Sequence, residues 1–290
     1  MDRREYLQSA GATAAILTAA GCVGGGGSDE TETADGADSS MEGTDSPTAT
    51  PESVVIGSDI PYRPFEYETT DGDLVGFDVA VADAVFGDQL GLRPEFQDTS
   101  FDGIIGSLNN GNFRAIMSAM TITDERDQEV DFSDPYFTAY QTILVLEDSD
   151  IDERSDLEGR TVGVQKGTTG AGAADALKAE FDGDMTIKRY DQIPAAFSAL
   201  QNNQVVAVIN DNTVNAEFLD NNDGVRFVEG DGEAASGDGE APPYLTLTVE
   251  EYGIAFREDD DEFRQGVNEA LAAIKDDGTY DEIYSEYFSG

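Results

Sequence analysis

Short apolar runs alternate with amphipathic stretches from about residue 53 onwards, and this alternation predicts strands and helices. The apolar runs predict strands at 53–59, 93–99, 114–120, 161–165, 185–190 and 205–211. Apolar residues at helical spacing predict helices at 76–91, 101–111, 169–181, 193–203 and 212–219. Such alternation is typical of α/β layers with a largely parallel sheet. Because the pattern occurs twice, we expect two similar α/β lobes.

Two further segments flank this pattern. Near the C-terminus Val267, Leu271 and Ile274 are spaced to form one apolar helix face. Residues 229–241 are rich in Gly and acids and carry no pattern of their own. We expect a final helix from the first segment and a loop of unknown role from the second.

The N-terminal residues indicate export. Arg3 and Arg4 precede a weakly apolar, Ala-rich run that is too short for a permanent membrane span. Twin arginines favour export of a folded chain. The run ends at Cys22, the only cysteine of the chain, after small residues at 19–21. It resembles a lipoprotein signal, although Ala19 stands where such signals usually carry Leu. We therefore predict an export signal at 1–21 and a lipid on Cys22, the first mature residue.

Residues 22–51 are almost free of apolar side chains and consist mainly of Gly, Ser, Thr and acids. Such a segment cannot bury enough surface to offset its ordering entropy. We predict a disordered acidic tether. A lipidated tether places the folded body at the extracellular face of the cell membrane.

Composition narrows the function classes. The chain has 16 Lys and Arg against 61 Asp and Glu, a formal net charge of -45. Molar salt screens such repulsion, so the acidity indicates adaptation to a halophilic environment. A nucleic-acid partner is not expected without a basic surface. The sequence contains no His, which argues against a metal-dependent hydrolase. Residues 166–175 lack both nucleotide-binding glycine patterns, and we expect no metal and no cofactor.

The order of strands indicates where a ligand would bind. In open α/β sheets ligands lie beyond the carboxyl ends of the strands. These ends correspond to residues 58–62 and 118–121 in the first lobe, and to 165–169 and 210–211 in the second. A ligand that touches all four segments would lie between the lobes.

Arg126 is unusual because it stands among Asp124, Glu125 and Asp127 in a chain poor in cations. A solvated surface pair is the simpler interpretation, worth about 0 to 1 kcal/mol. Thr123, however, is a good N-cap, which places Arg126 in the first turn of a helix, where a cation is disfavoured unless an anion lies nearby. Backbone N–H groups and a guanidinium at one place suit a carboxylate.

The other candidates each have a structural alternative. Asp211 could be a helix N-cap, and Asp59 could turn the chain before Pro61. Tyr62 and Phe101 could belong to the core. None of these residues identifies a site by itself.

Several colinear segments resemble the family 3 extracellular solute-binding proteins, the amino-acid receptors of ABC importers. These segments are 54–85, 99–137, 157–170 and 252–288, so that the resemblance extends over roughly residues 52 to 289. It implies a type II periplasmic-binding-protein-like fold with two α/β lobes. Lobe 1 would comprise 52–138 and 251–290, and lobe 2 would comprise 139–250. A two-strand hinge would lie near 136–140 and 249–252.

The resemblance also implies roles for particular residues. Those expected to hold a ligand carboxylate are Arg126, Thr121, Thr168 and Thr169, the last two with their backbone N–H groups. Those expected to hold an α-ammonium are Asp211 and Ser118. The side-chain pocket would consist of Asp59, Tyr62, Phe101, Gln165 and Asn210. Arg114 and Val206 depart from the family pattern, where acids are common, and we expect them to alter surface or hinge contacts.

These features together predict a monomeric receptor without enzymatic activity. It would bind a polar or cationic L-amino acid, because Asp59 between aromatic rings suits a cationic or amide side chain, and deliver it to an ABC importer permease. An alternative is a cyclohexadienyl-dehydratase-like enzyme on the same scaffold, with Asp59 as its acid or base. A sensor module is disfavoured, since no transmembrane or kinase segment follows Gly290. The sequence does not identify the amino acid or the permease.

Overall fold

The computed structural model describes residues 52–236 and 242–288. The predicted export signal at 1–21, Cys22 and the tether at 22–51 lie outside these residues, as does the end of the 229–241 loop. Within the described ranges, no helix combines the length and apolar character that crossing a membrane would require.

Lobe 1 contains a five-stranded sheet in the order β4-β1-β5-β13-β6. Its strands are β1 (Ser53–Ser58), β4 (Arg93–Asp98), β5 (Ala115–Ile116), β6 (Asp131–Phe132) and β13 (Ala255–Phe256). β1 pairs parallel with β4 and β5, whereas β13 pairs antiparallel with β5 and β6. The sheet is mixed rather than largely parallel, because β13 joins it only after the chain has passed through lobe 2.

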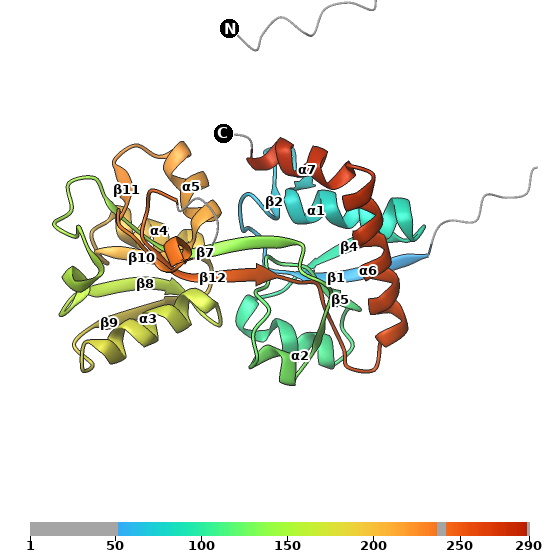
Figure 1. Cartoon of the computed structure of the whole chain (residues 1–290), viewed down its shortest axis with the longest axis horizontal. Helices are drawn as coiled ribbons and strands as arrows, with labels where there is room; N and C mark the ends of the chain where they lie inside the picture. The colour runs from blue at the N-terminus through green and yellow to red at the C-terminus, as the bar shows by residue number, and fades with distance from the viewer. Residues whose placement is uncertain (1–51, 237–241, 289–290) are drawn as a thin grey trace, which may run out of the picture. The chain divides into compact units, whose positions relative to one another are not determined.

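Helices cover both faces of this sheet, with α1 and α7 on one face and α2 on the other (Figure 1). The helical segments of lobe 1 are α1 (Phe77–Ala82), its π-helical continuation η1 (Asp83–Gln89), η2 (Phe101–Gly103), α2 (Ile104–Asn109), η3 (Arg126–Gln128), α6 (Asp261–Asp276) and α7 (Thr279–Phe288). A small hairpin is formed by β2 (Tyr67–Glu68) and β3 (Leu74–Val75). Val267, Leu271 and Ile274 are buried on α6, so the predicted apolar face is confirmed.

Lobe 2 contains a six-stranded sheet, in which β11-β7-β10-β8-β9 are consecutive and β12 also pairs with β7. The strands are β7 (Phe137–Leu146), β8 (Thr161–Gln165), β9 (Thr186–Tyr190), β10 (Ala207–Asp211), β11 (Val225–Phe227) and β12 (Thr246–Tyr252). The helical segments are η4 (Arg154–Leu157), α3 (Thr169–Glu180), α4 (Ile193–Gln201), α5 (Asn212–Asn221) and η5 (Glu233–Ser236). The predicted β-α-β units account for the parallel strands β8, β9 and β10.

Strands β7 and β12 connect the two lobes as an antiparallel pair (Figure 1). Tyr252 pairs with Phe137 at the lobe 1 end, and Val249 pairs with Tyr140 further along. The expected two-lobed α/β fold with a two-strand hinge is therefore the observed one. Since the strands run in opposite directions, the chain enters lobe 2 through β7 and returns through β12.

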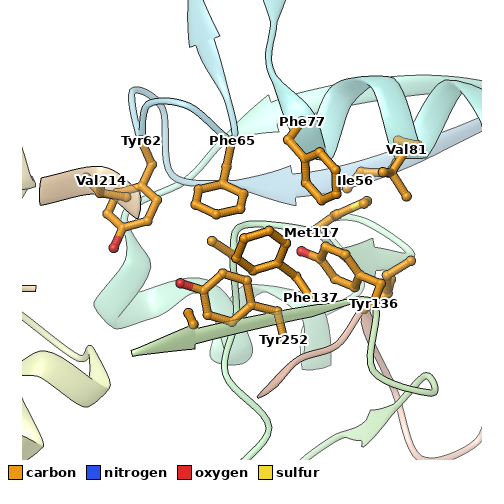
Figure 2. Close-up of a cluster of buried hydrophobic side chains, with 14 of the residues drawn as sticks. Ile56, Tyr62, Phe65, Phe77, Val81, Met117, Tyr136, Phe137, Val214 and Tyr252 are labelled. Carbon is orange, nitrogen blue, oxygen red and sulfur yellow. The ribbon is translucent and has the colours of Figure 1, made fainter. Parts of the chain in front are cut away.

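An aromatic cluster anchors the hinge in lobe 1 (Figure 2). Phe137 stacks on its pairing partner Tyr252 with ring centroids 5.5 Å apart, and Phe65 meets both rings edge-on at 5.2 and 5.4 Å. Phe288 of α7 packs against Phe137 at 4.9 Å. Aromatic pairs of this kind contribute about 0.5 to 1.5 kcal/mol each beyond burial. The lobe 1 ends of both hinge strands are thus held firmly, and bending is expected nearer to lobe 2.

Candidate functional site

A narrow cavity lies between the lobes, at the carboxyl ends of strands from both sheets. β1, β8 and β10 end at Ser58, Gln165 and Asp211, and the residues at or just after these ends face the cavity. This is the edge at which α/β sheets bind ligands. The lining residues are Asp59, Tyr62, Phe101, Ser118, Ala119, Thr121, Arg126, Gln165, Thr168, Thr169 and Asp211.

Ten of the eleven residues expected to contact a ligand line this cavity together. The exception is Asn210, which is buried behind the wall with its side-chain oxygen 3.1 Å from the Tyr62 hydroxyl. Ala119 was not anticipated. Its φ of 45° is left-handed, and its backbone N–H donates to Asp78 at 2.8 Å, which fixes the loop after β5.

Arg126 supplies the guanidinium of the cavity. Its Nη1 donates to the carbonyl of Thr121 at 2.6 Å, and its Nη2 donates across the cleft to the carbonyl of Gly167 at 3.1 Å. The guanidinium carbon lies 5.3 Å from the centre of the Phe101 ring. Burial lowers the pKa of Arg126, while the carboxylates of Glu250 and Asp211 oppose this shift. The remaining N–H donors of the fork are available for an anion.

The local structure around Arg126 differs from the expected helix start. Thr123 does cap the turn, since its hydroxyl accepts from the Arg126 backbone N–H at 3.2 Å. The helix is only the three-residue 3₁₀ segment η3, because β6 begins at Asp131. Such a short turn carries little helix dipole. Attraction for an anion at this place must come mainly from the guanidinium.

Asp211 is the acid contributed by lobe 2. It occupies the N-cap position of α5, but its side chain does not cap the helix. Instead its carboxylate accepts hydrogen bonds from the Tyr62 hydroxyl and from the Gln141 side-chain amide. Burial, together with the nearby charge of Glu250, raises the pKa of Asp211 to about 7. The helix-cap alternative is therefore wrong for its side chain, which faces the cavity.

Asp59 is the acid contributed by lobe 1, and it is only 3% exposed. One of its oxygens accepts from the backbone N–H of Phe101 at 2.7 Å and from the side-chain amide of Gln165 at 2.9 Å. Burial raises the pKa of Asp59 to about 6, and the charges of Asp98 and Asp102 add to this. The Gln165 bond crosses the cleft, so this acid also links the lobes.

Ser118 lies beside Asp59 and is oriented by two bonds. Its hydroxyl donates to Glu66 at 2.7 Å and accepts from the Asp59 backbone N–H at 2.9 Å. Because its single hydrogen is already donated, only a lone pair of the oxygen can face a ligand. That arrangement suits a donor such as an ammonium.

The hydroxyls of the three threonines are also engaged. Thr168 is the N-cap of α3: its oxygen accepts from the Ala171 backbone N–H, and its hydrogen goes to the Gln165 carbonyl. Thr121 and Thr169 both donate to Glu250, each at 2.7 Å. In this arrangement these threonines can offer a carboxylate backbone N–H groups rather than hydroxyl hydrogens.

Glu250 is the main feature that the sequence analysis missed. It lies on β12, is 6% exposed, and contacts threonines from both lobes. The sequence did contain an indication that Glu250 is buried. Side chains alternate between the two faces of a strand, so Glu250 lies on the same face as the buried Tyr252. Its neighbours Val249 and Glu251 lie on the opposite, exposed face. The pairing of β12 with β7 that buries this face cannot be deduced from β12 alone.

The charged side chains that line the cavity lack a close ion-pair partner among the described residues. In the part of the chain that the structure describes, no ion pair involves Arg126, Asp59 or Asp211. Buried charges are normally paired, since leaving one unpaired is costly. A ligand with one anionic and two cationic groups would complement all three. No group of acidic, Cys or His side chains in the described ranges is arranged to hold a metal ion.

Comparison with known proteins agrees with this geometry. Residues 54–290 match the family model described as bacterial extracellular solute-binding proteins, family 3. The chain is 33% identical over 247 residues to a probable histidine-binding protein of Neisseria gonorrhoeae, covering 84% of this chain and 86% of that protein. It is 33% identical over 240 residues to the arginine-binding extracellular protein ArtP of Bacillus subtilis, covering 82% and 86% respectively.

A solved structure extends the likeness to three dimensions. The arginine-, lysine-, histidine-binding protein ArtJ from Geobacillus stearothermophilus has a TM-score of 0.72 and 37% identity, over 82% of this chain and 96% of that one. These relatives are named for the solutes that they bind and not for a reaction, in agreement with a receptor that is not an enzyme. The chain belongs to the bacterial extracellular solute-binding proteins of family 3.

Proposed function

We propose that this chain binds a cationic L-amino acid between its two lobes and delivers it to the permease of an ABC importer. The observation that carries the proposal is the set of unpaired buried charges around one cavity: Arg126, Asp59 and Asp211. A cationic amino acid brings one carboxylate, one α-ammonium and one charged side chain. Its carboxylate can pair with Arg126, and its two cationic groups can pair with Asp211 and Asp59.

In this proposal Arg126 grips the carboxylate, assisted by Thr121, Thr168 and Thr169. Asp211 and Ser118 hold the α-ammonium, which agrees with the free lone pair on the Ser118 oxygen. The side chain of the ligand points to Asp59, with Gln165 beside it and Asn210 behind. The rings of Tyr62 and Phe101 would form its walls.

A cationic ligand is favoured over a neutral polar one. Asp59 lies close enough to Asp98 and Asp102 for their charges to raise its pKa, so this end of the cavity is strongly negative. A cationic side chain would neutralise that charge, whereas an amide would leave it uncompensated. The names of the relatives, which mention arginine, lysine and histidine, support the same class.

Closure of the lobes would couple binding to transport. The two halves of the proposed site lie on lobe 1, taken as 52–138 and 251–290, and lobe 2, taken as 139–250. A ligand that contacts both lobes binds the closed form more tightly and shifts the equilibrium towards it. The permease would then recognise the closed form.

The proposal also includes features that precede the folded body. A twin-arginine signal at 1–21, a lipid on Cys22 and a tether at 22–51 would hold a monomeric receptor at the extracellular face of the cell membrane of a halophile. Mass spectrometry of the membrane fraction tests this part, because lipidation adds acyl mass to a chain that begins at Cys22. A soluble chain that retains residues 1–21 would contradict it.

A thermal-shift screen of common amino acids in molar salt tests the binding function, since a specific ligand raises the unfolding temperature by mass action. We expect L-arginine, L-lysine or L-histidine to give the largest shift. In the Asp59→Asn variant the advantage of that ligand over L-glutamine should fall by about tenfold or more in affinity. The absence of a shift with any amino acid would overturn the proposal.

A further inference from the structure

Glu250 gathers hydrogen-bond donors from both lobes and from the hinge. Its Oε2 accepts from Thr121 of lobe 1 and Thr169 of lobe 2, both at 2.7 Å, and from Gln141 of β7 at 3.3 Å. Its Oε1 accepts from Thr248 on its own strand at 2.8 Å. The side chain is therefore held in one position at the hinge side of the cavity.

This carboxylate is a second acid beside Asp211. One side-chain nitrogen, Nε2 of Gln141, donates to both carboxylates, so the two acids are close neighbours. Both residues are buried, and no cation of the described residues forms an ion pair with either. Two buried carboxylates that share one neutral donor are an unfavourable pair unless one takes up a proton or a cation joins them.

Unsatisfied polar atoms surround the same place. The Tyr252 hydroxyl is buried close to the Asp211 carboxylate, and burial together with that charge raises the pKa of Tyr252. The Oε1 of Gln141 and the Nδ2 of Asn210 are buried without a hydrogen-bond partner among the described residues. Figure 2 shows the hydroxyls of Tyr62 and Tyr252 turned to the same side, away from Phe77. Buried polar atoms normally have partners, so their lack of one here indicates a place for a polar ligand group.

Glu250 also sets the direction of two hydroxyls. Because Thr121 and Thr169 donate their hydrogens to it, only the lone pairs of their oxygens can face the cavity. The wall around Asp211 thus presents acceptors and no hydroxyl donor. Acceptors attract an ammonium and repel a carboxylate. The backbone N–H groups of these threonines remain for the carboxylate, since neither donates a backbone hydrogen bond to another described residue.

We propose that Glu250 determines selectivity for the α-ammonium: with Asp211 it makes this end of the cavity a site for a cation, and through Thr121 and Thr169 it prevents a carboxylate from binding there. This inference rests on the proposed function, because it concerns the same ligand. It assigns to a hinge residue a role in choosing amino acids over acids that lack the amino group.

The test compares two ligands that differ only in the α-amino group, L-arginine and des-amino arginine (δ-guanidinovaleric acid), by calorimetry in molar salt. Glu250→Gln keeps the shape and removes the charge. We expect its affinity for L-arginine to fall about tenfold or more, and its affinity for des-amino arginine to change by about twofold at most. Glu251→Gln is the matched control, since Glu251 is exposed on the same strand, and it should change neither affinity.

Glu250→Met is a second uncharged variant with a side chain of similar length, and it also releases the hydroxyl hydrogens of Thr121 and Thr169. It should show the same loss of preference for L-arginine. An equal loss for both ligands would indicate a structural role only and would overturn the inference, as would an unchanged preference. If the wild type binds none of L-arginine, L-lysine and L-histidine, the proposed function itself fails, and this inference fails with it.

Discussion

The Tyr62 hydroxyl of lobe 1 donates its hydrogen to the Asp211 carboxylate of lobe 2. The bond joins the two lobes directly. Its acceptor, Asp211, is the residue that we propose to bind the α-ammonium of the ligand. Gln165 and Asp59 form a second such link, and Gln192 donates to the Ile60 carbonyl at 2.8 Å in a third. The residues that would recognise the ligand are therefore also residues that hold the lobes together.

Tyr62→Phe should shift the ligand-free protein towards open forms. The variant keeps the ring, which stacks on Phe65 at 6.1 Å, and loses a hydrogen bond to a charged group, worth about 1.5 to 3 kcal/mol. Small-angle X-ray scattering should show a larger radius of gyration than for the wild type. Tyr67→Phe is the control, because Tyr67 lies under Arg63, away from the cavity. Identical scattering from both variants would contradict this role of Tyr62.

Gly167→Ala should weaken ligand binding about tenfold or more. Gly167 has a left-handed φ of 75°, and a Cβ at this position would lie 2.9 Å from the Asp102 Cα on the opposite lobe. The methyl group therefore hinders closure. Gly172→Ala is the control, since a Cβ on this α3 residue meets nothing within 4 Å. It should leave binding unchanged and stabilise the fold by about 0.5 to 1 kcal/mol. Equal affinities of the two variants would show that the close approach of Gly167 and Asp102 does not matter for binding.

Affinity for L-arginine should rise between about pH 5 and about pH 8. Near pH 5 the free protein keeps protons on Asp59 and Asp211, whose pKa values are raised to about 6 and about 7 by burial. A bound cation favours the ionised forms, so binding releases protons and strengthens as the pH rises. The stability of the ligand-free fold follows the opposite trend. The protonated forms of Asp59 and Asp211 stabilise the fold at low pH, and this contribution is lost as the pH rises through their raised pKa values.

Calorimetry in buffers of different ionisation enthalpy measures this proton release. Asp59→Asn and Asp211→Asn should each remove part of the pH dependence. Asp150→Asn is a control at an exposed acid paired with Arg160, and it should keep the full dependence. Affinity that stays constant or falls over this range would be inconsistent with cation binding at these acids.

Much of the fold was predictable because its helices and strands have strong local patterns. The periodic apolar residues located α1, α3, α4 and α6, and the apolar runs located β1, β8 and β10. The rule that ligands bind beyond the carboxyl ends of strands then predicted that Asp59, Gln165 and Asp211 face one site. Residues that directly follow a strand are fixed by local geometry, so these positions could be deduced without knowing how the lobes pack.

Features that depend on distant pairing were not predictable in the same way. The role of Glu250 depends on the β12–β7 pair and on contacts more than a hundred residues away in sequence, such as that with Thr121. The lobe 1 sheet is mixed because β13 returns to it, and the lobe 2 sheet is mixed because β7 pairs antiparallel with β10, β11 and β12. The helix expected at Arg126 is one short turn, because the chain enters strand β6 soon afterwards and β6 pairs with β13. Pairing partners far apart in sequence overrode local propensity in each case.

The most direct measurement compares two variants, Arg126→Lys and Arg114→Lys. The affinity of each for L-arginine is measured by calorimetry in molar salt. Lysine keeps the charge but lacks the planar fork that binds a carboxylate in bidentate fashion. Arg114 lies outside the cavity, where it pairs with Asp260 at 2.8 Å, so its replacement is a matched control. We predict that Arg126→Lys loses about a hundredfold or more in affinity and that Arg114→Lys stays within about twofold of the wild type. Wild-type affinity in Arg126→Lys would contradict binding of an amino-acid carboxylate at this guanidinium.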